Sequence, residues 1–192
     1  RIAIHPQLHG FTLLQLSRAR SLLKQGFDRR STRALLLADQ ATDMIGKDTI
    51  DDLYTRMIVT GTLSGLHLGG YYLTRADILN ANGLSNQAIA ELEHLQKLTE
   101  KTYGQDETRN QAWTDIVLAK ALVGVGEYRE AAHKVRLALI TCHSIHSIQN
   151  IAIISDLYRR LTASPYGASM DVKALGDMLE EWYGLRFRGV SC

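Results

Sequence analysis

Apolar residues recur along this chain with the period of an amphipathic helix. In the stretch AIAELEHLQKL they fall at Ala88, Ile89, Leu92, Leu95 and Leu98. Spacings of three and four residues give a helix one apolar face. Similar segments fill most of the sequence, whereas the alternating patterns typical of strands are short and rare. The pattern therefore predicts an all-α protein.

Proline and glycine indicate where these helices can run and where they end. The only prolines are Pro6 and Pro165, so about 160 consecutive residues contain no proline, the residue that most strongly breaks a helix interior. Glycines such as Gly83 and Gly126 follow helical segments, where glycine supplies a left-handed C-terminal conformation. We predict helices near residues 9–25, 30–46, 50–82, 85–103, 107–125, 128–143, 147–162 and 170–183, with caps at Asp48, Ser85, Asp106, Ser147 and Ser169.

An internal repeat connects three of the glycines. Seven residues before each of Gly26, Gly83 and Gly126 stands an alanine, and four residues before each stands a leucine. Alanine then returns five residues after two of the glycines, at Ala88 and Ala131. Small residues in both helices of a hairpin let the pair approach closely and let the next pair stack on it.

This pattern resembles the tetratricopeptide repeat, and the stretch GVGEYREAAHKVRLAL matches it best. Gly126, Glu127 and Tyr128 correspond to the turn, and Ala131 and Ala138 to the small residues of the second helix. The early tryptophan is displaced, the closing proline is missing, and the glycines are 43 and 57 residues apart. The resemblance implies a right-handed stack of about four antiparallel helix pairs, an α-solenoid. It would form a single domain over residues 1–192, with units near 9–46, 50–103 and 107–143 and a capping pair at 147–183.

Charge and cysteine content exclude some functions and favour a compartment. Lys and Arg number 22 against 20 Asp and Glu, and the balance of +2 predicts no basic face for nucleic acid. Cys142 and Cys192 cannot form a disulfide framework, so we expect a reducing cytoplasm. No apolar run approaches the roughly 18 residues that a membrane span needs. The chain begins at Arg1 rather than Met, and we expect it to be part of a longer protein.

The glycine-rich stretch TGTLSGLHLGG, residues 60–70, is not predicted to be a catalytic loop. It lacks the Gly-Lys-Ser/Thr ending of a phosphate-binding loop, and Ser64 lacks the glycine spacing of a nucleophile elbow. Gly61, Gly65 and Gly69 instead form a stripe on one face of a helix. Close helix packing is the first interpretation of this stripe; a groove for a partner and a functional kink are the alternatives.

Other candidates for chemistry also fail on spacing. Cys142, His143 and His146 resemble part of a metal site, but no fourth ligand is near in sequence. Histidines at a helix C-terminus also interact favourably with the helix dipole. Adjacent carboxylates such as Glu180 and Glu181 diverge on a helix, and no Ser/His/Asp or Cys/His pattern is present. We therefore expect no metal, no cofactor and no enzymatic activity.

Polar residues fall where the inner face of a repeat stack is expected. The first helix of each pair lines that face, and its positions six and three residues before the glycines include several charged or polar side chains. Such side chains could hold an extended peptide backbone and a carboxylate. A hydrated groove without a ligand is the alternative. The predicted partner-binding residues are Arg20, Lys24, Asp77, Asn80, Trp113 and Lys120.

Long repeats of this kind resemble the C-terminal sensor regions of bacterial helix-turn-helix (XRE-type) transcriptional regulators. The ending DLYRRLTASPYGASMDVKALGDMLEEW is similar to the close of such chains. The resemblance implies a non-enzymatic sensor and dimerisation module that recognises a peptide or protein partner, with a DNA-binding domain upstream of residue 1. The alternatives are a stand-alone protein–protein interaction adaptor and a structural repeat segment of a larger multidomain protein.

Overall fold

A computed structural model describes residues 12–19, 36–37, 39–40, 67–102 and 108–185. Within these ranges every regular element is a helix and no strand occurs, which confirms the all-α prediction. Contacts between Cα atoms divide the chain into two compact units, Arg1–Tyr103 (unit 1) and Gly104–Cys192 (unit 2). The single domain over residues 1–192 stays a prediction. None of the described helices is long and apolar enough to cross a membrane.

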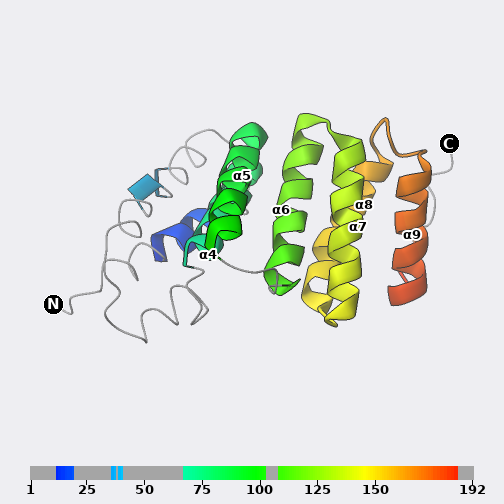
Figure 1. Cartoon of the computed structure of the whole chain (residues 1–192). Helices are drawn as coiled ribbons and strands as arrows, with labels where there is room; N and C mark the ends of the chain where they lie inside the picture. Colours follow the sequence, from blue (N-terminus) through cyan, green and yellow to red (C-terminus); the bar gives the residue numbers. More distant parts are fainter. Residues whose placement is uncertain (1–11, 20–35, 38, 41–66, 103–107, 186–192) are drawn as a thin grey trace. The chain divides into compact units, whose positions relative to one another are not determined.

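The described part of unit 1 includes a helical hairpin. Helix α4 (His67–Ala81) and helix α5 (Ser85–Thr102) pack against each other and are joined by a short turn (Figure 1). Residues 12–19 are also helical. Of the long helix predicted over residues 50–82, the part from His67 onward is helical, and residues 50–66 lie outside the described ranges. The core side chains of this hairpin are Leu73, Ala76, Ile78, Leu79, Ala88, Leu92 and Leu95.

Unit 2 is built around helix α7 (Tyr128–Ser144). This helix contacts α6 (Thr108–Val125), α8 (Ile151–Thr162) and α9 (Met170–Tyr183), as Figure 1 shows. A short 3-10 turn, η1 (Ile148–Asn150), precedes α8. The contacts on several sides follow from the sequence of α7, which buries residues at spacings of three and four. Its buried side chains are Ala131, Ala132, Val135, Ala138, Leu139 and Cys142.

The hairpins α4–α5 and α6–α7 close with the same turn. Gly83 and Gly126 both have a left-handed backbone, with φ values of 78° and 87°. The amide of the next residue donates to the carbonyl five residues earlier, Leu84 to Leu79 and Glu127 to Leu122, at 2.9 Å in each hairpin. These are the bonds of a Schellman motif, in which glycine avoids the steric cost of a Cβ.

The repeat alanines are buried in both hairpins, but not at the first predicted unit. Ala76 and Ala119, and likewise Ala88 and Ala131, have no exposed surface, and they mediate the close approach of the helices. Ala19, by contrast, is exposed. Gly26, Ala34 and the stripe glycines Gly61 and Gly65 lie outside the described residues.

The helix predicted near residues 147–162 differs from the structure in the type of its first turn. The predicted helix 147–162 begins instead with η1, and the α-helix proper starts at Ile151. Ser147 has an extended backbone, but its side chain forms no capping hydrogen bond, because the turn that follows is 3-10 rather than α. The predicted cap at Ser169 is confirmed, since its Oγ accepts a hydrogen bond from the amide of Val172 at 3.3 Å.

Candidate functional site

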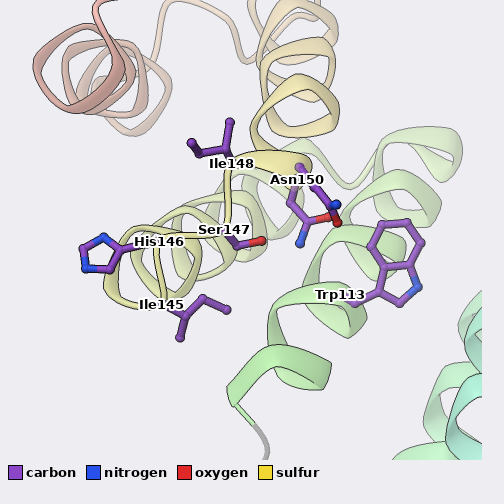
Figure 2. Close-up of a pocket in the computed structure, with 7 residues that line it drawn as sticks. Trp113, Ile145, His146, Ser147, Ile148 and Asn150 are labelled. Carbon is purple, nitrogen blue, oxygen red and sulfur yellow. The ribbon is translucent and has the colours of Figure 1, made fainter. Parts of the chain in front are cut away.

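A surface pocket of about 580 Å³ lies in unit 2, between α6 and the connection from α7 to α8. Trp113 lines it from α6, and the segment Ile145–Asn150 lines it from the connection (Figure 2). Ligand sites in proteins typically have volumes of about 300–1,000 Å³ and combine apolar walls with a few polar groups. The indole, two isoleucines and several hydrogen-bonding side chains give this pocket that composition.

The connection that forms the pocket leaves α7 through a strained residue. His146 has a left-handed backbone with φ of 52°, the only positive φ of a non-glycine residue within the described ranges. The amides of His146 and Ser147 donate to the carbonyls of His143 at 3.2 Å and Cys142 at 2.9 Å. This is the same turn that glycine forms in the two hairpins. These bonds end α7, and residues 148–150 then form η1 before α8 begins.

Asn150 is fixed at the pocket by a buried thiol. Its Nδ2 donates to the Sγ of Cys142 at 3.7 Å. Burial raises the pKa of the Cys142 thiol, and the hydrogen bond from Asn150 lowers it in part. The thiol therefore stays protonated at neutral pH and orients the amide of Asn150. In Figure 2 the Ser147 hydroxyl points toward Asn150 and α6, whereas the His146 ring points away.

Two of the predicted binding residues meet at the α6 wall. The Nζ of Lys120 lies 5.6 Å from the centroid of the Trp113 ring, within the range of a cation–π contact. Lys120 is two helical turns after Trp113, and its side chain reaches back because Cβ atoms on a helix point toward the N-terminus. Both side chains are partly buried. Lys120 is not among the residues that line the pocket, but it places a positive charge beside the Trp113 ring on α6.

The other predicted binding residues lie elsewhere. Asp77 and Asn80 belong to α4 in unit 1, whereas Arg20 and Lys24 are outside the described residues. Asp77 is 2% exposed, so its carboxylate is buried rather than exposed on a groove surface. Its Oδ2 accepts a hydrogen bond from the Nε of Arg18 at 3.0 Å, which compensates the burial of its charge. Asn80 is partly buried.

A second buried carboxylate was missed by the sequence analysis. Asp115 of α6 is 2% exposed; its Oδ2 accepts from the Nε2 of Gln111 at 3.3 Å, and its Oδ1 lies 3.4 Å from the Nζ of Lys134. This Oδ1 accepts no hydrogen bond, so the ion pair is the main compensation for its burial. Asp115 therefore ties α6 to α7 rather than lining the pocket.

The cysteine and histidines that resembled a metal site point in three directions. Cys142 is buried in the unit 2 core, and His143 stacks on Trp182 of α9 with ring centroids 4.2 Å apart. His146 is exposed at the turn. Among the residues that the structure describes, no three His, Cys, Asp or Glu side chains are grouped so that they could hold a metal ion. Cys142 and His143 instead contribute to packing within unit 2, and His146 forms the turn at the end of α7.

No protein-family model, curated protein or solved structure matches this chain. Ser147 and Asn150 were not predicted as pocket residues, because the sequence pattern of this stretch predicts the start of a helix. No glycine stands between Cys142 and Ile151, so the usual sequence mark of a helix end is missing there.

Proposed function

We propose that this chain is a binding module that recognises a peptide or protein segment. The observation that carries the proposal is the pocket of unit 2, where Trp113 and the hydrogen-bonding side chains of the α7–α8 connection line one cavity, with Lys120 beside the Trp113 ring. An aromatic surface together with amide and hydroxyl groups is suited to a polypeptide backbone with mixed side chains. Aromatic residues in such pockets often dominate binding energies.

The repeated hairpin supports a tetratricopeptide-like α-solenoid as the frame of this module. Helices α4 and α6 would be the first helices of two successive pairs, and they carry Asp77, Asn80, Trp113 and Lys120. In this arrangement the first helices line the inner face of the stack. Arg20 and Lys24 would extend the same face from the preceding pair. Within it, Asp77 would position Arg18 through their ion pair.

The pocket chemistry favours binding over catalysis. His146 is the one titratable side chain in its lining, and its ring points away from the other groups in Figure 2. General acid–base chemistry usually needs two positioned groups with different pKa values. We accordingly propose a non-enzymatic role without a cofactor. The resemblance of the repeats and of the C-terminal stretch to regulator sensor regions supports a role as the sensor and dimerisation part of a cytoplasmic helix-turn-helix regulator.

An unbiased peptide selection tests the proposal. A random peptide library displayed on phage is selected against the purified full chain, and enriched peptides are synthesised and titrated. We expect saturable binding that weakens at least tenfold in the Trp113→Ala, Lys120→Ala double variant. The matched control is Lys173→Ala, an exposed lysine on α9, which should bind as the wild type does. A selection without enriched peptides, or equal binding by the double variant, would contradict the proposal.

A second observation distinguishes the regulator from the adaptor alternative. The full-length gene either encodes a helix-turn-helix domain before residue 1 or does not. An upstream domain of this class would support the sensor role. Its absence would leave the peptide-binding proposal intact and favour a stand-alone adaptor.

A further inference from the structure

We infer that the unit 2 pocket selects an uncharged, extended peptide segment and holds it mainly through its backbone amides. An apolar side chain of the segment would lie against Trp113 and Ile145. Ser147, Gln149 and Asn150 would form hydrogen bonds with its N–H and C=O groups. This inference rests on the proposed function and specifies the ligand class of the same site.

Unused hydrogen-bonding groups lie on the connection that lines this pocket. Within the described part of the chain, neither the hydroxyl of Ser147 nor the amide of Gln149 forms a side-chain hydrogen bond. The Nδ2 of Asn150 is already bonded within the chain, which leaves its Oδ1 as an acceptor. The serines on either side of the connection differ, because Ser144 and Ser155 donate to carbonyls of their own helices at 2.8 and 2.7 Å. The free capacity is therefore specific to the pocket lining.

These groups match the backbone of an extended peptide. A hydroxyl and a primary amide each donate and accept, whereas an amide oxygen only accepts. An extended segment presents N–H and C=O groups for such bonds, and its side chains then decide which sequence fits. Ile148, with 76% of its surface accessible, continues the apolar surface beyond the pocket. The lining thus suits a segment of several residues rather than a small ion.

The lining also determines the charge of the segment. Among the described residues that line the pocket, none is an aspartate, glutamate, lysine or arginine. The ring of His146 points away from the other side chains in Figure 2. Lys120 lies beside the Trp113 ring but outside the lining. A carboxylate or ammonium group in the pocket would lose water without gaining a counter-charge, so the segment there is expected to be uncharged.

The apolar wall does not need an unpaired group. Trp113 is partly buried and has contacts within the chain, one of them with Lys120. These contacts hold the indole in place, and an apolar side chain uses only the surface that the ring leaves open. A wall that is already ordered lowers the entropy cost of binding.

The test uses two-dimensional proton–nitrogen NMR spectra of the full chain, in which the side-chain amides of Gln149 and Asn150 report directly on the pocket. Four acetylated and amidated heptapeptides carry leucine, glutamate, lysine or serine between two runs of three serines. We expect saturable shifts of both signals with the leucine peptide and roughly tenfold weaker binding of the other three. Equal binding of the glutamate or the lysine peptide, or no saturable shift with the leucine peptide, would overturn the inference.

Protein variants and esters locate the contacts. Gln149→Ala and Asn150→Ala should each weaken binding of the leucine peptide about tenfold, whereas Gln87→Ala, the same change at an exposed position of α5, should not. Successive N–H groups of an extended chain point to opposite sides. An ester in place of either the leucine N–H or the next N–H should therefore weaken binding, and Asn150→Ala should have no further effect on that ester. Unchanged binding of both esters would contradict recognition through the backbone.

The inference and the proposed function can fail separately. If library-selected peptides bind but leave the signals of Gln149 and Asn150 unchanged, or need a charged residue to shift them, this inference fails while peptide recognition stands. If the library yields no binding peptide and the leucine peptide gives no shift, both fail.

Discussion

The hairpins α4–α5 and α6–α7 share one frame but differ in their polar contacts. Residues 43 positions apart correspond, so that Gly83 matches Gly126 and Ala88 matches Ala131, and the turn hydrogen bonds are the same. At matching polar positions the contacts diverge. Asp77 is buried against Arg18, whereas its counterpart Lys120 lies over Trp113.

A similar divergence occurs between the two helices of each hairpin. In the first, Tyr72 of α4 contacts His94 of α5 edge to face, and Glu91 binds the Nε of Arg75 at 2.7 Å. In the second, the counterparts of Tyr72 and Glu91 are Asp115 and Lys134, and these two form an ion pair. The small and apolar positions thus determine the hairpin, while the polar positions are free to serve different contacts. In the second hairpin, Trp113 of α6 lines the pocket.

The largest expected effect is at Lys134, whose removal leaves the buried Asp115 carboxylate without its ion pair. Lys134→Met should lower the free energy of unfolding by about 2–3 kcal/mol. This loss is smaller than the loss expected for a fully buried ion pair, because Lys134 is partly exposed. Urea unfolding followed by circular dichroism measures this loss. The corresponding change Glu91→Gln in the first hairpin should cost less than about 1 kcal/mol, since that pair is more exposed.

A double variant tests the cause of the loss. Asp115→Asn combined with Lys134→Met should be more stable than Lys134→Met alone, because the uncompensated charge is gone. If Lys134→Met unfolds at the wild-type urea concentration, Asp115 is compensated by other groups and the comparison of the two hairpins must be revised.

The next effect concerns the shared alanines. Ala131→Leu and Ala88→Leu should each lower the free energy of unfolding by about 1–3 kcal/mol, because both sites are fully buried and extra methylenes force the helices apart. Ala152→Leu on the exposed side of α8 is the matched control and should be close to neutral. A neutral Ala131→Leu would show that the α6–α7 interface has room, contrary to its burial.

The sequence predicted the parts of this fold that depend on local patterns. Gly83 and Gly126 were found because a left-handed residue after a helix strongly favours glycine, and the alanines because their spacing repeats. The burial of Asp77 was not predictable in this way. Its partner Arg18 is 59 residues earlier in the sequence, and helical periodicity gives no information about such a contact.

The candidate site shows the same limit. Lys120 was selected from its repeat position and Trp113 as a residue near it, and the two lie together because they share one helix. Ser147 and Asn150 join them only through the turn at His146, where no glycine marks the helix end. Without that mark, the sequence of the α7–α8 connection reads as the beginning of a helix. The position of the Asn150 side chain depends on tertiary contacts, in particular on its hydrogen bond to the thiol of Cys142.

The turn glycines should contribute equally in both hairpins. Gly83→Ala and Gly126→Ala should each lower the free energy of unfolding by about 1–2 kcal/mol, which is the cost of a left-handed residue with a Cβ. No atom lies within 4 Å of a Cβ at either site, so the cost is conformational rather than steric. Thermal or urea unfolding of both variants checks this. Unequal losses would show that the two turns differ in ways their hydrogen bonds do not reveal.

A smaller effect separates the two serine caps. Ser169→Ala should cost about 1 kcal/mol, because it removes the hydrogen bond that Val172 donates at the start of α9. Ser147→Ala should change the free energy of unfolding by much less, since Ser147 forms no such bond. Urea unfolding of both variants measures the difference. A loss at Ser147 equal to that at Ser169 would contradict the 3-10 start of this segment.

The smallest expected effect extends the comparison to the third turn of this type, at His146. Here a histidine occupies the left-handed position that Gly83 and Gly126 hold in the hairpins. His146→Gly removes a strain of about 1–2 kcal/mol but adds the entropy that glycine loses on folding, about 0.5–1 kcal/mol. The variant should therefore be more stable by about 0.5 kcal/mol in urea unfolding. His133→Gly, at an exposed position inside α7, is the control and should be less stable by about 0.3–0.5 kcal/mol, the difference between the helix propensities of histidine and glycine. If His146→Gly is destabilised as much as this control, the imidazole itself supports the connection, and the strain at the pocket is offset by a contact of that side chain.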